Sequence, residues 1–233
     1  MAESNVTELG LSLDSATVKK GVIYSPALVP NGGGNYVLGF NSRLTTPGVA
    51  GWFMNQVNFS PMLKGSSIRA CIQRGISGGP TNFAPFIFTS AQGNSVADQA
   101  YLLGLEDADP HRIVFRKGVL TGGLPSASIG NQGIWSKSSA TFVPGTWLHL
   151  RMDIIKEPNG DILVQFFQSN LVANPWQTPV WVPIPGMPDF VDDSLEIATN
   201  SAPLTSGRAG FAMQTKDVTR RAFFKKVELW RQL

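Results

Sequence analysis

The stretch from Gly145 to Phe167, "GTWLHLRMDIIKEPNGDILVQFF", decides the fold class. Successive side chains of an extended strand point to opposite faces. The apolar side chains therefore share one face, which carries Leu148, Leu150, Met152 and Ile154. Asn159 and Gly160 tolerate the positive φ angles that tight turns need, and "DILVQFF" then resumes the alternation. The stretch predicts a β-hairpin whose first strand opens at Trp147.

The other face of that strand carries His149, Arg151 and Asp153. Nucleophilic catalysis needs a nucleophile, a base and an orienting group. The chain has only two histidines and no G-x-S-x-G string, so the sequence gives little indication of a serine triad. A polar row on one strand also pairs with its neighbours across a sheet. We therefore interpret the row as a polar contact surface and assign no catalytic residue.

The remainder of the chain repeats short β-rich segments that are punctuated by turn residues. Its 24 glycines and 16 prolines suit many short strands, and good helical windows are nearly absent. In the last strand, simple alternation places Phe223, Val227 and Leu229 on one face. The pattern predicts an all-β, antiparallel two-sheet sandwich over residues 36–233. Residues 1–35 are predicted to be an N-terminal extension or arm.

Composition narrows the class of protein further. Hydrophobic residues make up 42% of the 233 residues and charged residues 15%, which allows a sizeable core. A net charge of +3 is too small for a typical nucleic-acid binder, and we expect no such partner. Cys71 is the single cysteine, so no intrachain disulfide forms. We find no signal peptide and no apolar run of membrane-spanning length, and we expect synthesis in a cytoplasm.

Four segments in order resemble the concanavalin A-like superfamily of legume lectins, laminin G-like modules and laminarinase-type glycosidases. They are "GTWLHLRMDI", "NGDILVQFF", "GRAGFAMQ" and "RRAFFKKVELW". The resemblance implies a jelly-roll sandwich. Glycosidases of this superfamily carry an E-x-D-x-x-E strand, and no such string occurs here. Lys225 and Lys226 stand where many relatives have an aspartate. We therefore expect a protein that is not an enzyme, with a divergent glycoside hydrolase as the third hypothesis.

A cytosolic-type start, one cysteine, a jelly-roll domain and glycine-rich loops together resemble tailed-bacteriophage virion proteins. The first hypothesis is thus a structural component of a virion, such as a decoration, collar or tail-associated protein. Its partners would be further copies of itself and other virion proteins, and its location the virion. The second hypothesis is a lectin-like carbohydrate-binding module that uses exposed aromatic side chains. The candidate partner or glycan contacts are Trp135, Trp176, Trp181, His149, Arg151 and Asp153.

The histidines and the cysteine are too few for a typical structural zinc site. The segment "EDADPH" places Glu106, Asp107, Asp109 and His111 close together, and calcium is conceivable there. The EF-hand string is absent, and an Asp-Pro turn is the simpler use of the segment. We expect no cofactor and no metal, with calcium as the alternative.

Overall fold

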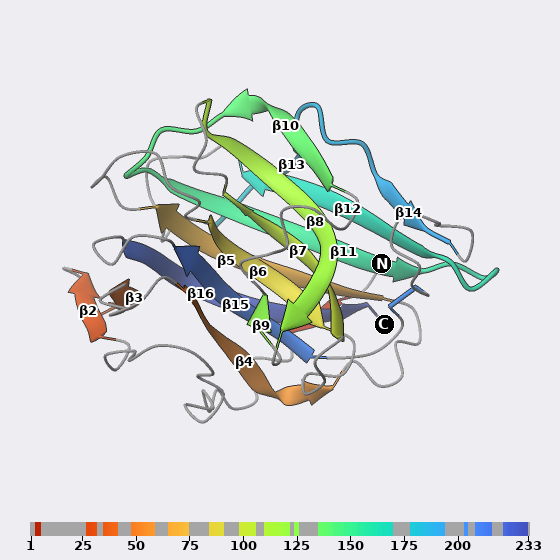
Figure 1. The fold of residues 1–233 in the computed structure, drawn as a ribbon, viewed down its shortest axis with the longest axis horizontal. Helices are drawn as coiled ribbons and strands as arrows, with labels where there is room; N and C mark the ends of the chain where they lie inside the picture. Colours follow the sequence, from red (N-terminus) through yellow and green to blue (C-terminus); the bar gives the residue numbers. More distant parts are fainter. Residues whose placement is uncertain are drawn as a thin grey trace.

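The computed structural model gives two antiparallel β-sheets facing one another (Figure 1). It describes residues 3–5, 27–31, 35–41, 48–58, 65–74, 84–90, 98–105, 110–121, 124–125, 135–169, 178–193, 203–204, 208–215 and 221–232. Within these ranges the chain forms 16 strands and no helix. None of the described segments is a helix long and apolar enough to cross a membrane. The predicted all-β sandwich is confirmed.

The larger sheet has nine strands and contains the hairpin. Its order is β13 (Trp181–Pro183), β12 (Ile162–Ser169), β11 (Trp147–Lys156), β5 (Gly65–Arg74), β16 (Arg221–Gln232), β3 (Asn35–Asn41) and β2 (Ala27–Asn31). Off this path, β1 (Glu3–Asn5) pairs with β16 and β14 (Phe190–Asp192) pairs with β12. β1 and β2 belong to the predicted extension, and a domain boundary at residue 35 stays a prediction.

The smaller sheet has seven strands. Its order is β10 (Trp135–Thr141), β8 (Arg112–Thr121), β7 (Asp98–Leu105), β6 (Ala84–Ser90), β15 (Arg208–Thr215) and β4 (Gly48–Asn58), with β9 (Leu124–Pro125) beside β8. Consecutive strands β6, β7 and β8 are neighbours, whereas β15 inserts between β6 and β4. Such a crossover brings segments far apart in the sequence into one sheet.

The hairpin forms as the sequence predicts. β11 and β12 pair from Leu150 opposite Gln168 to Lys156 opposite Ile162. Gly160 has a φ angle of 99°, a backbone conformation that glycine adopts more readily than residues with a side chain. Its N–H donates a hydrogen bond to the Glu157 carbonyl at 3.0 Å. The Asn159 side-chain oxygen accepts from the Asp161 N–H at 3.1 Å. The turn thus fixes the register of the two strands.

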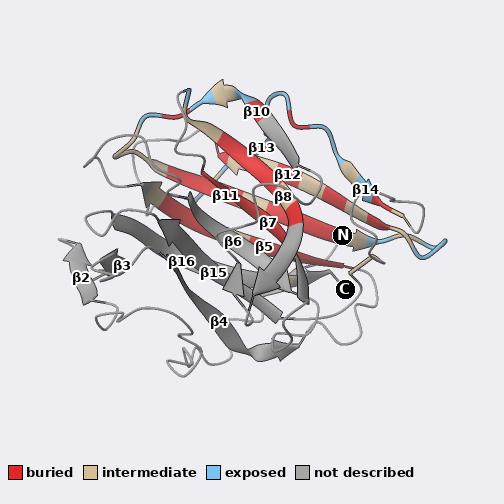
Figure 2. Cartoon of the chain, viewed as in Figure 1, coloured by how far each residue is buried: buried red, intermediate tan, exposed pale blue. Residues whose placement is uncertain are grey.

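The core lies between the sheets and is built from the predicted apolar face (Figure 2). Leu150 and Met152 are fully buried. The ring of Phe115 from β8 lies 4.5 Å from that of Phe166 from β12, so aromatic packing joins the two layers. Each fully buried side chain of this kind contributes about 1.5–3 kcal/mol. The same core cluster includes Ile68, Ile72, Leu103, Ile113, Leu150, Ile154, Ile162 and Val164.

One edge of the sandwich is closed by the turn that links β13 to β14. Ile184 and Met187 are buried there, and the Ile184 N–H donates to the Phe166 carbonyl of the larger sheet at 3.0 Å. The Ser139 N–H of β10 donates to the Pro185 carbonyl at 2.8 Å. The turn therefore makes a hydrogen bond to each sheet at this edge.

A buried polar cluster also crosses the core. Lys117 of β8 and Asp192 of β14 are both fully buried, and Lys117 Nζ lies 2.7 Å from Asp192 Oδ1. The Tyr101 hydroxyl donates to the other carboxylate oxygen and accepts from the Leu204 N–H at 3.1 Å. Burial, aided by the neighbouring Asp192 carboxylate, raises the pKa of Tyr101 far above its ordinary value. The cluster links β7 and β8 to β14 across the two layers.

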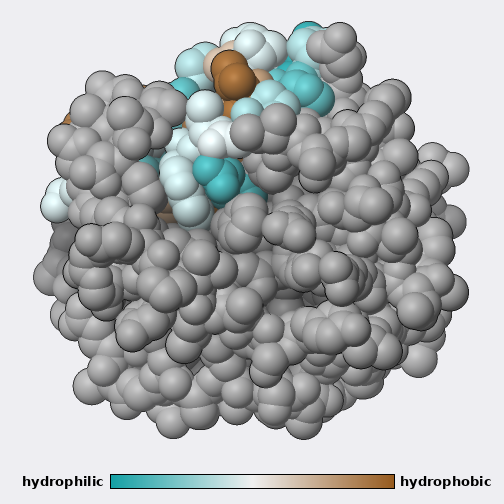
Figure 3. All heavy atoms as spheres, turned by 90° about the vertical axis from the view of Figure 1, so that its left-hand side faces the viewer, coloured by the Kyte–Doolittle hydropathy of each residue, from teal (hydrophilic) through white to brown (hydrophobic). Residues whose placement is uncertain are grey.

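Little apolar side-chain surface is exposed in the described part of the chain. Its exposed large hydrophobic residues are Val143, Val180 and Val191. Figure 3 shows the face on the left of Figure 1, where the described residues at the upper edge are mostly hydrophilic or neutral around one small hydrophobic patch. Isolated residues of this kind are ordinary on a protein surface.

Candidate functional site

The candidate site lies on the outer face of the larger sheet, opposite the core. Register fixes its layout, because directly opposed residues of paired strands share a face. Asp153 lies opposite both Ser67 and Gln165, and Arg151 lies opposite Arg69 and Phe167. His149 lies opposite Cys71, while Phe167 and Ser169 lie opposite Pro183 and Trp181. In the pairing of β16 with β5, Glu228 lies opposite Arg69 and Trp230 lies opposite Ser67.

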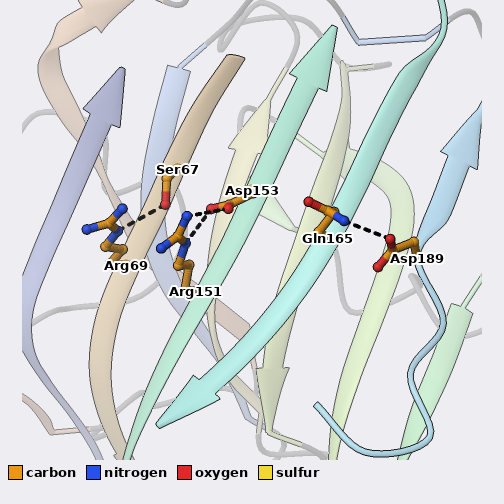
Figure 4. Close-up of polar contacts among 6 residues, drawn as sticks. All are labelled: Ser67, Arg69, Arg151, Asp153, Gln165 and Asp189. Atoms are coloured by element: carbon orange, nitrogen blue, oxygen red, sulfur yellow. Dashed lines mark hydrogen bonds and ion pairs between the residues drawn. The ribbon is translucent and has the colours of Figure 1, made fainter. Parts of the chain in front are cut away.

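Arg151 and Asp153 form a two-point ion pair along β11. Arg151 Nε lies 2.7 Å from Asp153 Oδ1, and Nη2 lies 2.5 Å from Oδ2. The side chains are 17% and 4% exposed, so water screens the pair only in part. A bidentate pair of this kind fixes the plane of the guanidinium. Figure 4 shows the two side chains pointing toward one another from the same strand.

Arg69 of β5 lies beside Arg151 on the neighbouring strand (Figure 4). Its Nε donates to Ser67 Oγ at 3.0 Å, and its guanidinium carbon lies 4.4 Å from the centre of the Trp230 ring. A cation stacked on an aromatic face is stabilised by the ring quadrupole. Both arginines of this face are therefore held in defined orientations by neighbouring side chains.

Trp181 joins the two arginines. The guanidinium carbons of Arg69 and Arg151 each lie 6.0 Å from the centre of its ring. Phe167 completes the group, with the Arg151 guanidinium carbon 5.1 Å from its ring centre. The arginine–aromatic cluster is defined here as Arg69, Arg151, Phe167, Trp181 and Trp230. It combines flat apolar rings with charged hydrogen-bond donors.

The polar row is more deeply buried than the sequence predicts. His149 is 4% exposed and Asp153 is 3% exposed. The His149 ring meets the Trp181 ring edge-on, with the centroids 6.4 Å apart, and Cys71 opposite it is fully buried. The structure differs from the expected exposed or half-exposed sheet face because aromatic side chains from β12, β13 and β16 lie among the polar ones.

A second polar contact lies toward the β12 edge of this face. Gln165 Nε2 donates to Asp189 Oδ2 at 2.7 Å (Figure 4). Asp189 belongs to the segment between β13 and β14, so it comes from outside the hairpin.

Aromatic platforms beside amide, carboxylate and guanidinium groups supply the contacts that a sugar ring needs, which are an apolar surface and directional hydrogen bonds.

The structure brings four of the six predicted contact residues together: His149, Arg151, Asp153 and Trp181. Trp135 is the first residue of β10 in the other sheet, and its side chain lies outside the described residues. Trp176 lies wholly outside them. Sequence reasoning missed Arg69, Phe167 and Trp230. Alternation in "SSIRACIQR" marks Arg69 as a residue on the polar side of its strand, but only strand order places it beside Arg151.

The predicted calcium segment is only partly visible. Glu106, Asp107 and Asp109 lie outside the described residues. His111 is described, and its ring packs 5.6 Å from that of Phe142. No group of three or more histidine, cysteine or acidic residues able to hold a metal occurs in the described ranges. Calcium therefore stays a prediction.

The fold is the two-sheet jelly-roll sandwich predicted from the sequence, and solved structures of other proteins share it. An endo-β-1,4-glucuronan lyase from the fungus Trichoderma reesei aligns over 99% of this chain and 95% of its own, with 8% identity and a TM-score of 0.53. The carbohydrate recognition domain of Emp47p aligns over 95% of this chain and 97% of its own, with 15% identity and a TM-score of 0.51. A carbohydrate binding module from Bacillus subtilis aligns over 97% of this chain and 92% of its own, with 10% identity and a TM-score of 0.46. No protein-family model and no curated protein matches the chain.

One expectation is corrected by these comparisons. The missing E-x-D-x-x-E string predicted a protein that is not an enzyme. The glucuronan lyase has the same fold, so that prediction is overturned. The string belongs to one class of reaction, glycoside hydrolysis, and its absence does not bear on other chemistry on the same sandwich. The glucuronan lyase and the carbohydrate recognition domain give the virion role no support.

Proposed function

We propose that the chain binds a saccharide on the outer face of its larger sheet. One observation carries the proposal: Trp181 lies within 6.0 Å of the guanidinium carbons of both Arg69 and Arg151. Rings stack on the apolar faces of sugars, and fixed donors beside them orient the hydroxyl groups. The similar folds of a carbohydrate recognition domain and a lyase support this choice over the other hypotheses.

The direct experiment is a glycan array, with and without calcium, followed by titration calorimetry on the saccharides that bind. Trp181→Ala is expected to weaken binding about fivefold to tenfold, because stacking on a ring contributes on the order of 1 kcal/mol. Trp181→Phe keeps a ring and is expected to retain part of the affinity. Val180→Ala, at the exposed neighbouring position, is the matched control and is expected to leave binding unchanged.

The same mixtures are to be followed by chromatography for shortened saccharides. Product formation would make the chain an enzyme that acts on the bound saccharide. An array with no bound glycan, together with unchanged thermal unfolding in the presence of the same glycans, would overturn the proposal.

The virion role predicted from the sequence stays a separate prediction, as do self-association and location in a virion. It is tested by mass spectrometry of purified phage particles and by the mass of the chain in solution at high concentration. Detection in particles would support the virion role and would leave saccharide binding to be decided by the glycan experiments.

A further inference from the structure

We propose that the saccharide is acidic, and that Arg69 and Arg151 together bind its carboxylate or sulfate group. This inference rests on the proposed function and names the class of ligand for the same site. It follows from the placement of two arginines at directly opposed positions of β5 and β11, with both guanidinium carbons 6.0 Å from the centre of the Trp181 ring.

Like charges directly opposite one another across paired strands destabilise a sheet. Asp153 offsets the charge of Arg151 through the two-point ion pair. The register also places Glu228 of β16 opposite Arg69. An anion bound between the two arginines would lower their mutual repulsion.

The two guanidinium groups are also oriented before any ligand binds. Ser67 holds Nε of Arg69, which lies over Trp230, while Asp153 holds Nε and Nη2 of Arg151. Less side-chain entropy is lost when preorganised groups bind a ligand. Arginine also matches the planar, two-oxygen geometry of a carboxylate better than lysine does. An acidic group on a sugar stacked at Trp181 would be within the reach of both residues.

The test compares two ligands that differ only at carbon 6 of each sugar, β-1,4-linked oligoglucuronate and uncharged β-1,4-linked oligoglucose. Binding is measured by calorimetry on the full chain at low and high salt, and dextran sulfate serves as the sulfated arm. The variants are Arg69→Gln, Arg69→Lys and the pair Arg151→Gln/Asp153→Asn, which leaves no unpaired charge between those two positions. Lys156→Gln removes one positive charge from an exposed position of β11 and is the matched control. Thermal unfolding checks that each variant is folded.

We expect the affinity for oligoglucuronate to be at least about tenfold higher than the affinity for oligoglucose, and we expect high salt to lower the affinity for oligoglucuronate. Arg69→Gln and the double variant are expected to lose about tenfold, Arg69→Lys to lose part of this, and Lys156→Gln to lose less than about twofold. Equal affinity for the two oligosaccharides, or a folded Arg69→Gln protein with full affinity for oligoglucuronate, would overturn the inference while leaving saccharide binding intact. Dextran sulfate binding that drops equally in Arg69→Gln and Lys156→Gln would assign the effect to general charge attraction and would also overturn it. If no saccharide binds, the proposed function itself fails.

Discussion

Arg151 and Asp153 lie two positions apart on β11 and are joined by two contacts of 2.7 and 2.5 Å. Alternate residues of a strand share a face, so this ion pair needs no second strand to bring its partners together. The neighbouring strands supply its surroundings, which are Arg69 on one side and Phe167 on the other. A local sequence pattern thereby becomes part of a site to which five strands contribute, β5, β11, β12, β13 and β16.

Replacing Arg151 alone should lower the free energy of unfolding more than replacing both Arg151 and Asp153. Arg151→Gln leaves the carboxylate of the buried Asp153, whose side chain is 4% exposed, without its two-point partner. We expect the free energy of unfolding to fall by up to about 3 kcal/mol. This is the lower end of the cost of breaking a buried ion pair, because Arg151 is partly exposed. The double variant Arg151→Gln/Asp153→Asn should recover much of that loss. Urea unfolding of both variants measures the difference, and equal losses would show that the pair is not coupled.

The turn that closes the sandwich edge depends on Gly186. Its φ is +74°, and a Cβ atom there would lie 2.6 Å from the backbone nitrogen of Ser139. Gly186→Ala should cost about 1–3 kcal/mol for the backbone conformation and more for displacing β10. Gly160→Ala is the matched control, because φ is +99° but nothing lies within 4 Å of the added Cβ. Thermal unfolding should rank Gly186→Ala as the less stable variant, and the opposite ranking would contradict the close approach of the turn to β10.

The ion pair between Lys117 and Asp192 is fully buried. Lys117→Met should lower the free energy of unfolding by about 3–5 kcal/mol, because it leaves a buried carboxylate without its cation. Lys117→Met/Asp192→Asn should be less destabilised than Lys117→Met, since no buried charge remains at either position. The measurement is urea unfolding at neutral pH. A Lys117→Met protein as stable as the parent would show that the pair contributes little to joining the sheets.

Tyr101 should make stability fall at alkaline pH. Its pKa is raised in the folded chain by burial and by Asp192, whereas an unfolded tyrosine titrates near pH 10.0. Above that pH the unfolded chain has lost a proton that the folded chain retains, so the free energy of unfolding falls by about 1.4 kcal/mol per pH unit from this group. Below that pH the contribution is constant.

Tyr101→Phe removes that titration while keeping the ring. Unfolding free energies measured from pH 9 to pH 11 should fall less steeply for this variant than for the parent, by up to about 1.4 kcal/mol per pH unit. Parallel curves would mean that Tyr101 ionises as readily in the folded chain as in the unfolded one. The comparison with the parent cancels the contribution of the other tyrosines and the lysines.

Local patterns predicted the hairpin well and the last strand less well. In β11 the apolar face is uninterrupted, and its residues are buried as alternation predicts. In β16 simple alternation places Phe223 and Leu229 on one face. The pairing with β5 instead shifts register between Lys225 and Glu228, so Phe223 lies opposite Gln73 and Leu229 opposite Ile68, on different faces. A bulge adds one residue to a strand, and period-2 reasoning on one sequence does not reveal where it falls.

The sequence by itself determined that this chain forms antiparallel strands, where the hairpin turns, and that Arg151 and Asp153 share a face. These features depend on residues close together along the chain, through side-chain alternation and turn geometry. Only the tertiary structure decided that Arg69 lies beside Arg151, that Trp181 and Trp230 join them, and that Lys117 meets Asp192 across the core. Those contacts depend on strand order and on the packing of two sheets, which are set by the collective burial of apolar faces from the whole chain.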